Sequence, residues 1–190
     1  MPKAITVETV QRFLLDAGAV FVNWGEEGQR LLGATRGGNT FAVEQEVKET
    51  EIDGARGDVK GTRRVITVRP RLTVNLLEFT AENLQLALAG TDITDSDETG
   101  GEGGTTHKKI SRTGNGTITV DKHITNIALA AETSGGKQGI FIIKNALSDG
   151  NLELATEDKN EAVLEVQFTG HFDPANIEEE PWEIIWPNEE

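Results

Sequence analysis

Two long runs of alternating apolar and polar residues, separated by a glycine-rich stretch, constrain the fold of this chain most strongly. The first run covers residues 39–49, where Phe41, Val43 and Val47 alternate with polar side chains. The second begins at Val65 and alternates in the same way as far as Leu76. A period of two is typical of strands that bury one face. We therefore predict a long β-hairpin, and Pro70 within its second strand indicates an edge position or a bulge.

The stretch between the two runs, "EIDGARGDVKGT" at residues 51–62, combines three glycines with charges of both signs. The wider segment 44–64 carries six acids and five bases. Mixed charges at a protruding hairpin tip suit a head-to-tail contact, in which the bases of one subunit meet the acids of its neighbour. The alternative is a solvated tip that contacts no partner.

One helix and several further strands complete the predicted fold. In "FTAENLQLALAG", Thr80 is a good N-cap, Gly90 can end the helix, and one apolar stripe contains Ala81, Leu84, Ala87 and Leu88. Strand patterns follow in "GTITVDKHI", "NIALAAE", "GIFIIKNAL", "NLELATE" and "AVLEVQFTGHF". A single amphipathic helix must lie against a sheet. We predict a mainly β fold: an antiparallel β-sandwich or partial barrel with one flanking α-helix.

The length of 190 residues suits a single domain, 1–190. Within it we expect an N-terminal arm at residues 1–17, where Val10, Phe13 and Leu14 fall at helical spacing, followed by a first strand. Residues 92–116 are polar and glycine-rich, which predicts a mobile acidic loop on the outside of the protein. The acidic C-terminal tail, residues 173–190, is different because it contains two tryptophans. Exposed tryptophan is costly, so we expect Trp24, Trp182 and Trp186 to dock on the same chain or on a neighbour.

The charge is unevenly spread. Of the net charge of -14, twelve units lie in two segments without a base, residues 91–106 and 173–190. An acidic chain without a basic cluster is not expected to hold nucleic acid, which requires neutralisation of phosphates. Without cysteine there is no disulfide, thiol chemistry or Cys-based zinc site. No apolar run approaches a membrane span or a signal peptide. We expect a soluble, unsecreted protein that is made in a reducing cytoplasm.

The sequence contains no persuasive catalytic, cofactor or metal motif. Asp95 and Asp97 match the first half of a calcium loop, but Thr106 stands where its bidentate glutamate should be. The three histidines lie in separate segments without ligand spacing, and no Gly-Lys-Ser/Thr follows the glycine loop. The tripeptide Arg56-Gly57-Asp58 is best explained by chance. We expect no enzyme, no cofactor and no metal, unless residues distant in the sequence form a catalytic cluster.

Two blocks of the sequence carry a family resemblance. The block "LLGATRGGNTFAVEQEVKETEIDGARGDVKGTRRVITVRPRLTVNLLEFTAENLQLAL" contains a strand, a glycine and charge loop, a long strand and a helix introduced by Thr. In this order, and with the ending "VLEVQFTGHFDPANIEEEPWEIIWP", the chain resembles the major tail tube proteins of long-tailed, non-contractile bacteriophages. The resemblance implies a β-sandwich with a flanking helix, assembled as hexameric rings that stack into a hollow tube.

The resemblance also implies the partners and the location of the protein. Its partners would be further copies of itself and the tail-tip, tape-measure and tail-terminator proteins. DNA would pass through the tube during ejection without specific binding, and no membrane would be involved. The protein would be made in the host cytoplasm and end in the virion tail.

In such proteins the long hairpin contributes to the inner sheet of the tube, and its loop contacts the next ring. The resemblance therefore implies these ring-to-ring contact residues: Ile52, Asp53, Arg56, Asp58, Lys60 and Arg63. It implies these lumen residues: Glu44, Glu46, Lys48, Arg69 and Arg71. A lumen through which DNA slides should not be net positive. This face would be close to neutral if its acids and bases pair across the strands.

Two alternatives stay open. Tube proteins of contractile tails or of bacterial secretion machines share the implied fold. A monomeric β-sandwich that binds a ligand such as carbohydrate would also explain the strands and the acidity, although the aromatic platform it needs would have to form without any tyrosine.

Overall fold

The computed structural model describes residues 5–96, 107–112, 114 and 116–188. As predicted, the fold is mainly antiparallel β with few helices. The strands are β1 (Ala19–Val22), β2 (Arg30–Leu31), β3 (Thr35–Glu49), β4 (Arg63–Leu76), β5 (Asp92–Ser96), β6 (His107–Ser111), β7 (Ile124–Glu132), β8 (Gln138–Ser148), β9 (Leu164–Gly170) and β10 (Trp182–Ile185). The helices are α1 (Val7–Gln11), α2 (Ala81–Ala87) and the short 3₁₀ helix η1 (Val120–Lys122).

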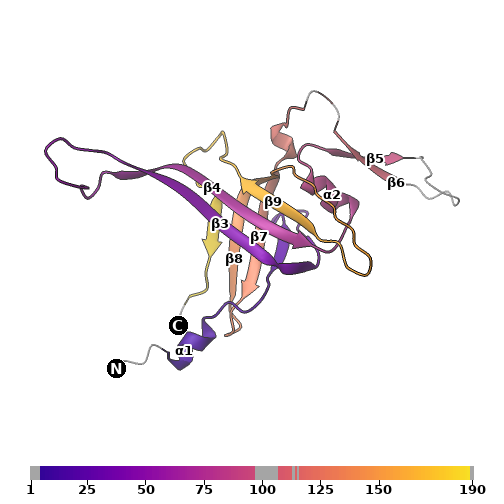
Figure 1. The fold of residues 1–190 in the computed structure, drawn as a ribbon, viewed down its shortest axis with the longest axis horizontal. Helices are drawn as coiled ribbons and strands as arrows, with labels where there is room; N and C mark the ends of the chain where they lie inside the picture. The colour runs from indigo at the N-terminus through magenta and orange to yellow at the C-terminus, as the bar shows by residue number, and fades with distance from the viewer. Residues whose placement is uncertain (1–4, 97–106, 113, 115, 189–190) are drawn as a thin grey trace.

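One antiparallel sheet, in the order β2-β1-β7-β8-β9-β4-β3, folds over on itself to make two layers. The fold occurs at β8, which pairs with β7 along one edge. Its other edge is shared, because β10 pairs with residues 140–143 and β9 with residues 146–148. Strands β3 and β4 consequently cross in front of β7 and β8 (Figure 1). The arrangement agrees with the predicted sandwich or partial barrel.

The core lies between these two layers. Its fully buried side chains include Leu72 and Val74 of β4, Phe168 of β9 and Ile143 of β8. The apolar positions of the alternation that predicted β4 are the ones that enter this core, since Leu72, Val74 and Leu76 all point inward. Across the layers the rings of Phe41 and Phe141 lie 5.3 Å apart.

Helix α2 packs against the core beside the sandwich. As predicted, Thr80 is its N-cap, and the Thr80 side chain accepts a hydrogen bond from the Asn83 backbone. The predicted apolar stripe is only part of the buried face, because Asn83 is also buried. Its side-chain amide donates to the carbonyl oxygens of Leu32, at 2.8 Å, and Glu78, at 3.1 Å. A buried amide therefore ties the helix to the segment that follows β2.

The prediction of a loop over residues 92–116 is wrong for residues 92–96 and 107–111. There β5 and β6 form a two-stranded hairpin (Figure 1). One acid of β5 faces a base of β6, since Asp95 lies opposite Lys108, and such a pair stabilises a sheet. Lys108 also forms an ion pair with Glu82 of α2, at 2.9 Å. Residues 97–106, 113 and 115 of the predicted loop lie outside the described residues.

Two predicted strands do not form. Most of "GTITVDKHI" (116–124) is irregular apart from η1, and "NLELATE" (151–157) contains no strand. The side chains of Leu152 and Leu154 are exposed there, so their alternation has no layer to bury it. None of the helices in the described ranges is long and apolar enough to cross a membrane.

Candidate self-association surfaces

The hairpin of β3 and β4 continues well beyond the sandwich as a two-stranded ribbon (Figure 1). The pairing of β4 with β9 reaches Arg71, and from Pro70 toward the hairpin tip β4 has β3 as its neighbour. Pro70 therefore marks the point where β4 loses its second partner, which agrees with its predicted edge position. We call residues 44–69 the extension.

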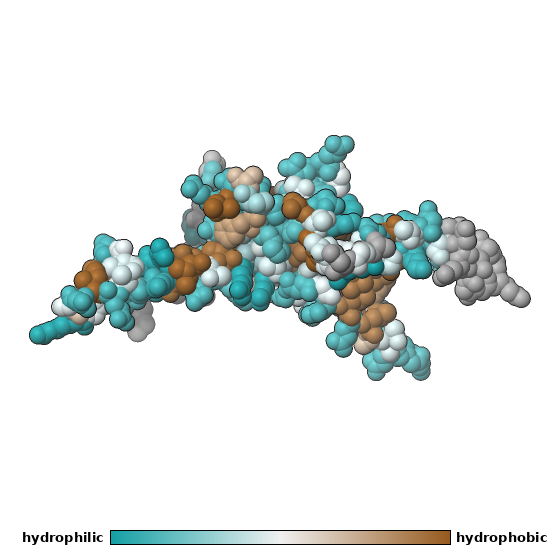
Figure 2. Space-filling model, turned by 90° about the horizontal axis from the view of Figure 1, so that it is seen from above, coloured by the Kyte–Doolittle hydropathy of each residue, from teal (hydrophilic) through white to brown (hydrophobic). Residues whose placement is uncertain are grey.

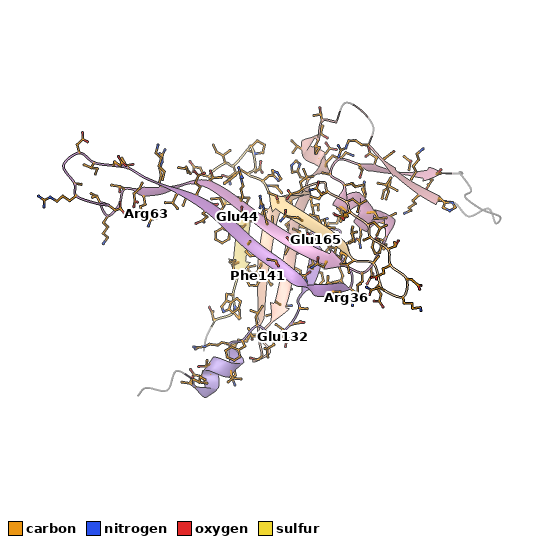
Figure 3. All side chains as sticks on the ribbon, in the orientation of Figure 1. Arg36, Glu44, Arg63, Glu132, Phe141 and Glu165 are labelled. Atoms are coloured by element: carbon orange, nitrogen blue, oxygen red, sulfur yellow. The ribbon has the colours of Figure 1, made fainter. Side chains whose placement is uncertain are left out.

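The tip of the extension is an exposed loop. Its turns are closed by hydrogen bonds from Ala55 N to Ile52 O, at 3.1 Å, and from Thr62 N to Val59 O, at 3.2 Å. Ile52 is 49% exposed. The structure brings together at this tip the residues predicted to contact the next ring: Ile52, Asp53, Arg56, Asp58, Lys60 and Arg63. Arg63 lies at the base of the loop (Figure 3). It forms an ion pair with Glu49 at 3.2 Å. Contact with another copy stays a prediction.

The residues predicted to line a lumen share one face of the hairpin. Glu44 lies directly opposite Arg69, and its carboxylate forms an ion pair with Arg71 at 3.2 Å. Glu46 accepts a hydrogen bond from the Thr67 hydroxyl at 3.3 Å. The predicted pairing of acids and bases across the strands is therefore present for Glu44.

A β-bulge interrupts the ladder within the extension. The pair Glu46 and Thr67 is followed by the pair Val47 and Val65, so Ile66 is an extra residue on β4. The next pair brings two bases together, Lys48 and Arg64.

The charged face of the hairpin consequently has more bases than acids. By register it combines the five predicted lumen residues with Arg64, so two carboxylates meet four bases. A lumen through which DNA slides should not be net positive. Among the described residues, this face would satisfy that expectation only if acids from elsewhere offset its two extra bases.

An apolar patch is exposed beside the bulge, and we define it as Val47, Val65 and Ile66. Their exposed fractions are 43%, 47% and 46%. Closer to the sandwich, Leu72 of the same hairpin is buried in the core and Phe41 packs against it. Figure 2 shows apolar atoms along the extension, flanked by polar ones. Because the patch lies beyond the sandwich, the opposite layer of the sandwich does not cover it.

The C-terminal tail docks on its own chain. Trp182 pairs with Ile143 in the ladder between β10 and β8. The ring of Trp186 lies 6.2 Å from that of Phe141, and it covers Gly139 so closely that a β-carbon there would meet it at 2.6 Å. Trp24 packs edge-on against Phe21 at 4.9 Å, and its backbone is hydrogen-bonded to the side chain of Asn126. All three tryptophans thus contact their own chain, but Trp186 stays 43% exposed, and docking on a neighbour stays a prediction.

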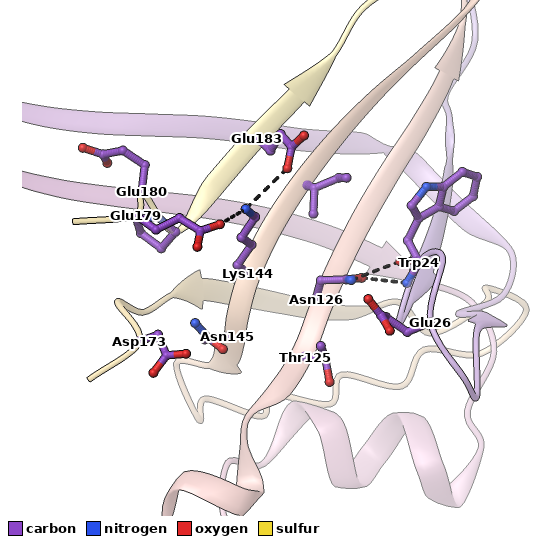
Figure 4. Close-up of a pocket in the computed structure, with 12 residues that line it drawn as sticks. Trp24, Glu26, Thr125, Asn126, Lys144, Asn145, Asp173, Glu179, Glu180 and Glu183 are labelled. Atoms are coloured by element: carbon purple, nitrogen blue, oxygen red, sulfur yellow. Dashed lines mark hydrogen bonds and ion pairs between the residues drawn. The ribbon is translucent and has the colours of Figure 1, made fainter. Parts of the chain in front are cut away.

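A hollow between the tail and the sandwich has five acids among the twelve residues that line it (Figure 4). Lys144 of β8 lies among them and forms ion pairs with Glu179 and, at 3.4 Å, Glu183. The hydrogen bond from Lys144 lowers the pKa of Glu179, and the same bond raises the pKa of Lys144. Lys144 thus fastens the acidic tail to the body.

The N-terminal arm is attached to the turn after β7. Ser134 and Gly135 donate backbone hydrogen bonds to the carbonyls of Phe13, at 2.8 Å, and Gln11, at 2.9 Å. The apolar residues that predicted the helix do not enter the core, since Val10 and Phe13 are 50% and 48% exposed. The arm is a second exposed apolar surface.

Two of the three histidines lie in contact in the structure, which their spacing in the sequence did not indicate. His123 and His171 meet edge to face with ring centroids 5.1 Å apart, and each Nδ1 lies 3.2 Å from a backbone carbonyl. Among residues 5–96, 107–112, 114 and 116–188, no group of three or more His, Asp or Glu side chains is arranged to hold a metal ion.

Comparisons with known proteins give structural likenesses but no match in sequence. No protein-family model matches the chain, and no curated protein matches it. A solved structure described as the tail of an empty GTA particle, computed with helical refinement in C6 symmetry, is similar to the chain with a TM-score of 0.43 and 9% sequence identity. The match covers 90% of this chain and 96% of that chain.

Proposed function

We propose that this protein is a structural subunit that assembles, copy on copy, into the hollow tail tube of a bacteriophage. The observation that carries the proposal is the extension, residues 44–69. A two-stranded ribbon is at best marginally stable by itself. This one leaves the sandwich with an exposed apolar patch and an exposed, charged tip. Contact with another copy would bury the apolar patch and would pair the charges of the tip with opposite charges.

The extension favours a head-to-tail arrangement of copies. It protrudes from the sandwich (Figure 1), whereas the apolar arm and the tail lie on other parts of the molecule. A contact between two different surfaces leaves a free surface of each kind on every dimer, so growth continues until a ring closes or a filament forms. Stacked hexameric rings are the form that the sequence resemblance favours.

The conduit for DNA is the finer part of the proposal. The proposed tube needs a lumen that does not bind DNA, so its lining must have its bases offset by acids. The ion pair of Glu44 with Arg71 supports this on the charged face of the hairpin. The proposed role is structural and requires no catalytic group, metal or cofactor. Tip, tape-measure and terminator components of a virion tail would be its other partners.

Removal of the extension's tip tests the proposal. In the variant, residues 50–62 are replaced by Asn-Gly, which closes a two-residue hairpin turn. We expect the variant to keep the melting temperature of the wild type, because the tip lies outside the core. Light scattering should show a mass that rises with concentration for the wild type and stays that of a monomer for the variant. Equal assembly of both proteins would count against the proposal.

A further inference from the structure

The bulge in the extension leaves two bases side by side. Lys48 and Arg64 are directly opposite each other in the ladder, and both are exposed. Like charges at opposed positions destabilise a β-ribbon. Neither base forms an ion pair with any acid of the described residues. Carboxylates from another molecule would relieve this repulsion.

On the same stretch of ribbon lies the apolar patch of Val47, Val65 and Ile66, which the sandwich does not cover. Successive side chains of a strand point to opposite faces, so the two bases lie on one face of the ribbon and the patch on the other. A partner must therefore run along the edge of the ribbon and offer two things, one to each face. It needs carboxylates that are free of bases, and it needs exposed aliphatic side chains.

The C-terminal tail of this same chain offers both. Residues 173–190 contain seven acids and no base. Exposed aliphatic side chains are interspersed with them, since Ile184 and Ile185 of β10 are each 44% exposed. Strand β10 pairs with β8 along one edge, and its other edge has no strand neighbour among the described residues.

The acids of the tail differ in their availability. Glu179 and Glu183 are already paired with Lys144. Glu178 and Glu180 are exposed, and no ion pair is recorded for either of them within the described ranges. These two carboxylates are the natural counterpart of two unpaired bases.

We infer that the bulge of one copy docks on the C-terminal tail of a second copy. Lys48 and Arg64 pair with Glu178 and Glu180 of that copy. The apolar patch covers Ile185 of the same tail, which lies on the face of β10 opposite to Ile184. The inference rests on the proposed self-assembly, and it names the two surfaces that meet.

The contact explains two features together. Acids of the neighbour offset the excess of two bases on the charged face of the hairpin. The bulge, which adds Ile66 to one strand, is what places Lys48 opposite Arg64, because without it Lys48 would lie opposite Val65.

Charge reversal on each side of the contact tests the inference. The first variant carries Lys48→Glu and Arg64→Glu, and the second carries Glu178→Lys and Glu180→Lys. Each alone places like charges across the contact, so we expect each to remain monomeric in light scattering while the wild type assembles. An equimolar mixture should assemble, because the reversed bulge of the first variant fits the reversed tail of the second.

A matched control changes charge by the same amount elsewhere. Lys109→Glu with Lys159→Glu reverses two exposed bases outside the contact and should assemble like the wild type. Melting temperatures of all variants should match that of the wild type, which shows that the monomers are folded.

The outcomes separate the two proposals. A wild-type protein that never assembles overturns both the proposed function and the inference. If the wild type assembles, then assembly of either variant alone, or a mixture that stays monomeric, overturns the inference and leaves the proposed function standing.

Discussion

Pro70 of β4 and Gly170 of β9 are packed so closely that a β-carbon on Gly170 would lie 2.8 Å from the Cγ atom of Pro70. The same added carbon would lie 2.6 Å from Cγ2 of Ile143 and 2.9 Å from the carbonyl oxygen of Pro181. Strands β4, β8 and β9 and the tail therefore meet at this glycine. The extension leaves the sandwich from the same junction.

Substitution of Gly170 is expected to loosen that junction. Because one neighbour is backbone and another is a proline ring, Gly170→Ala should lower the free energy of unfolding by about 1 to 3 kcal/mol. Urea unfolding measures the change. Gly57→Ala is the matched control, since nothing lies within 4 Å of a β-carbon there. An equal stability of the two variants would contradict the packing described.

Loss of the buried amide of Asn83 is expected to detach helix α2. Asn83→Ala removes the donor to the carbonyls of Leu32 and Glu78, as well as the acceptor for Arg30 at 3.0 Å. A buried polar group without its partner costs about 1 to 3 kcal/mol, and urea unfolding should show a loss in this range. Asn160→Ala, at an exposed turn, should leave the stability unchanged. If both variants unfold alike, the amide does not hold the helix.

Local patterns were sufficient for much of the fold. The alternation in β4 and the cap at Thr80 predicted elements that the structure contains, because each depends on neighbours in the sequence. Asn83 was missed because its role comes from Leu32, more than fifty residues away in the chain. The strand predicted at Leu152 and Leu154 fails for the same reason, since no strand lies beside it.

The attachment of the tail should depend on pH. The pKa of Glu179 is lowered. Its contribution to the free energy of unfolding is therefore present above the ordinary pKa of 4.5 and is lost as the pH falls through the lowered pKa. The raised pKa of Lys144 means that its contribution is present below the ordinary value of 10.5 and is lost as the pH rises through the raised value.

Urea unfolding across the pH range measures this dependence. The wild type should be more stable than Lys144→Met between these limits, and the difference should vanish at both extremes. A difference that does not change with pH would assign the effect to packing of the lysine stem.

The candidate surfaces were harder to predict than the fold. The sequence indicated the charged tip, since Arg56 and Lys60 stand out among glycines. The bulge at Ile66 was missed, because the second strand was predicted to begin at Val65, where the adjacent apolar residues Val65 and Ile66 look like the start of the alternation rather than a break in it. The pairing of Lys48 with Arg64 follows from that bulge and was missed with it.

Reversal of the charges at the tip is expected to prevent assembly without unfolding the monomer. In Arg56→Glu with Lys60→Glu, the tip loses the two bases that would meet acids of a neighbour. The melting temperature should stay that of the wild type, because both side chains are exposed. Sedimentation of assembled material measures the effect, with Lys109→Glu and Lys159→Glu as the control. A wild-type yield of assembled protein would show that the tip makes no essential contact.

The most direct test of self-assembly is negative-stain electron microscopy of the purified protein at high concentration. Hollow tubes or hexameric rings are the predicted result. A protein that remains a monomer at every concentration, and also after purified tail tips are added as nuclei, would contradict the account and favour a monomeric binding module.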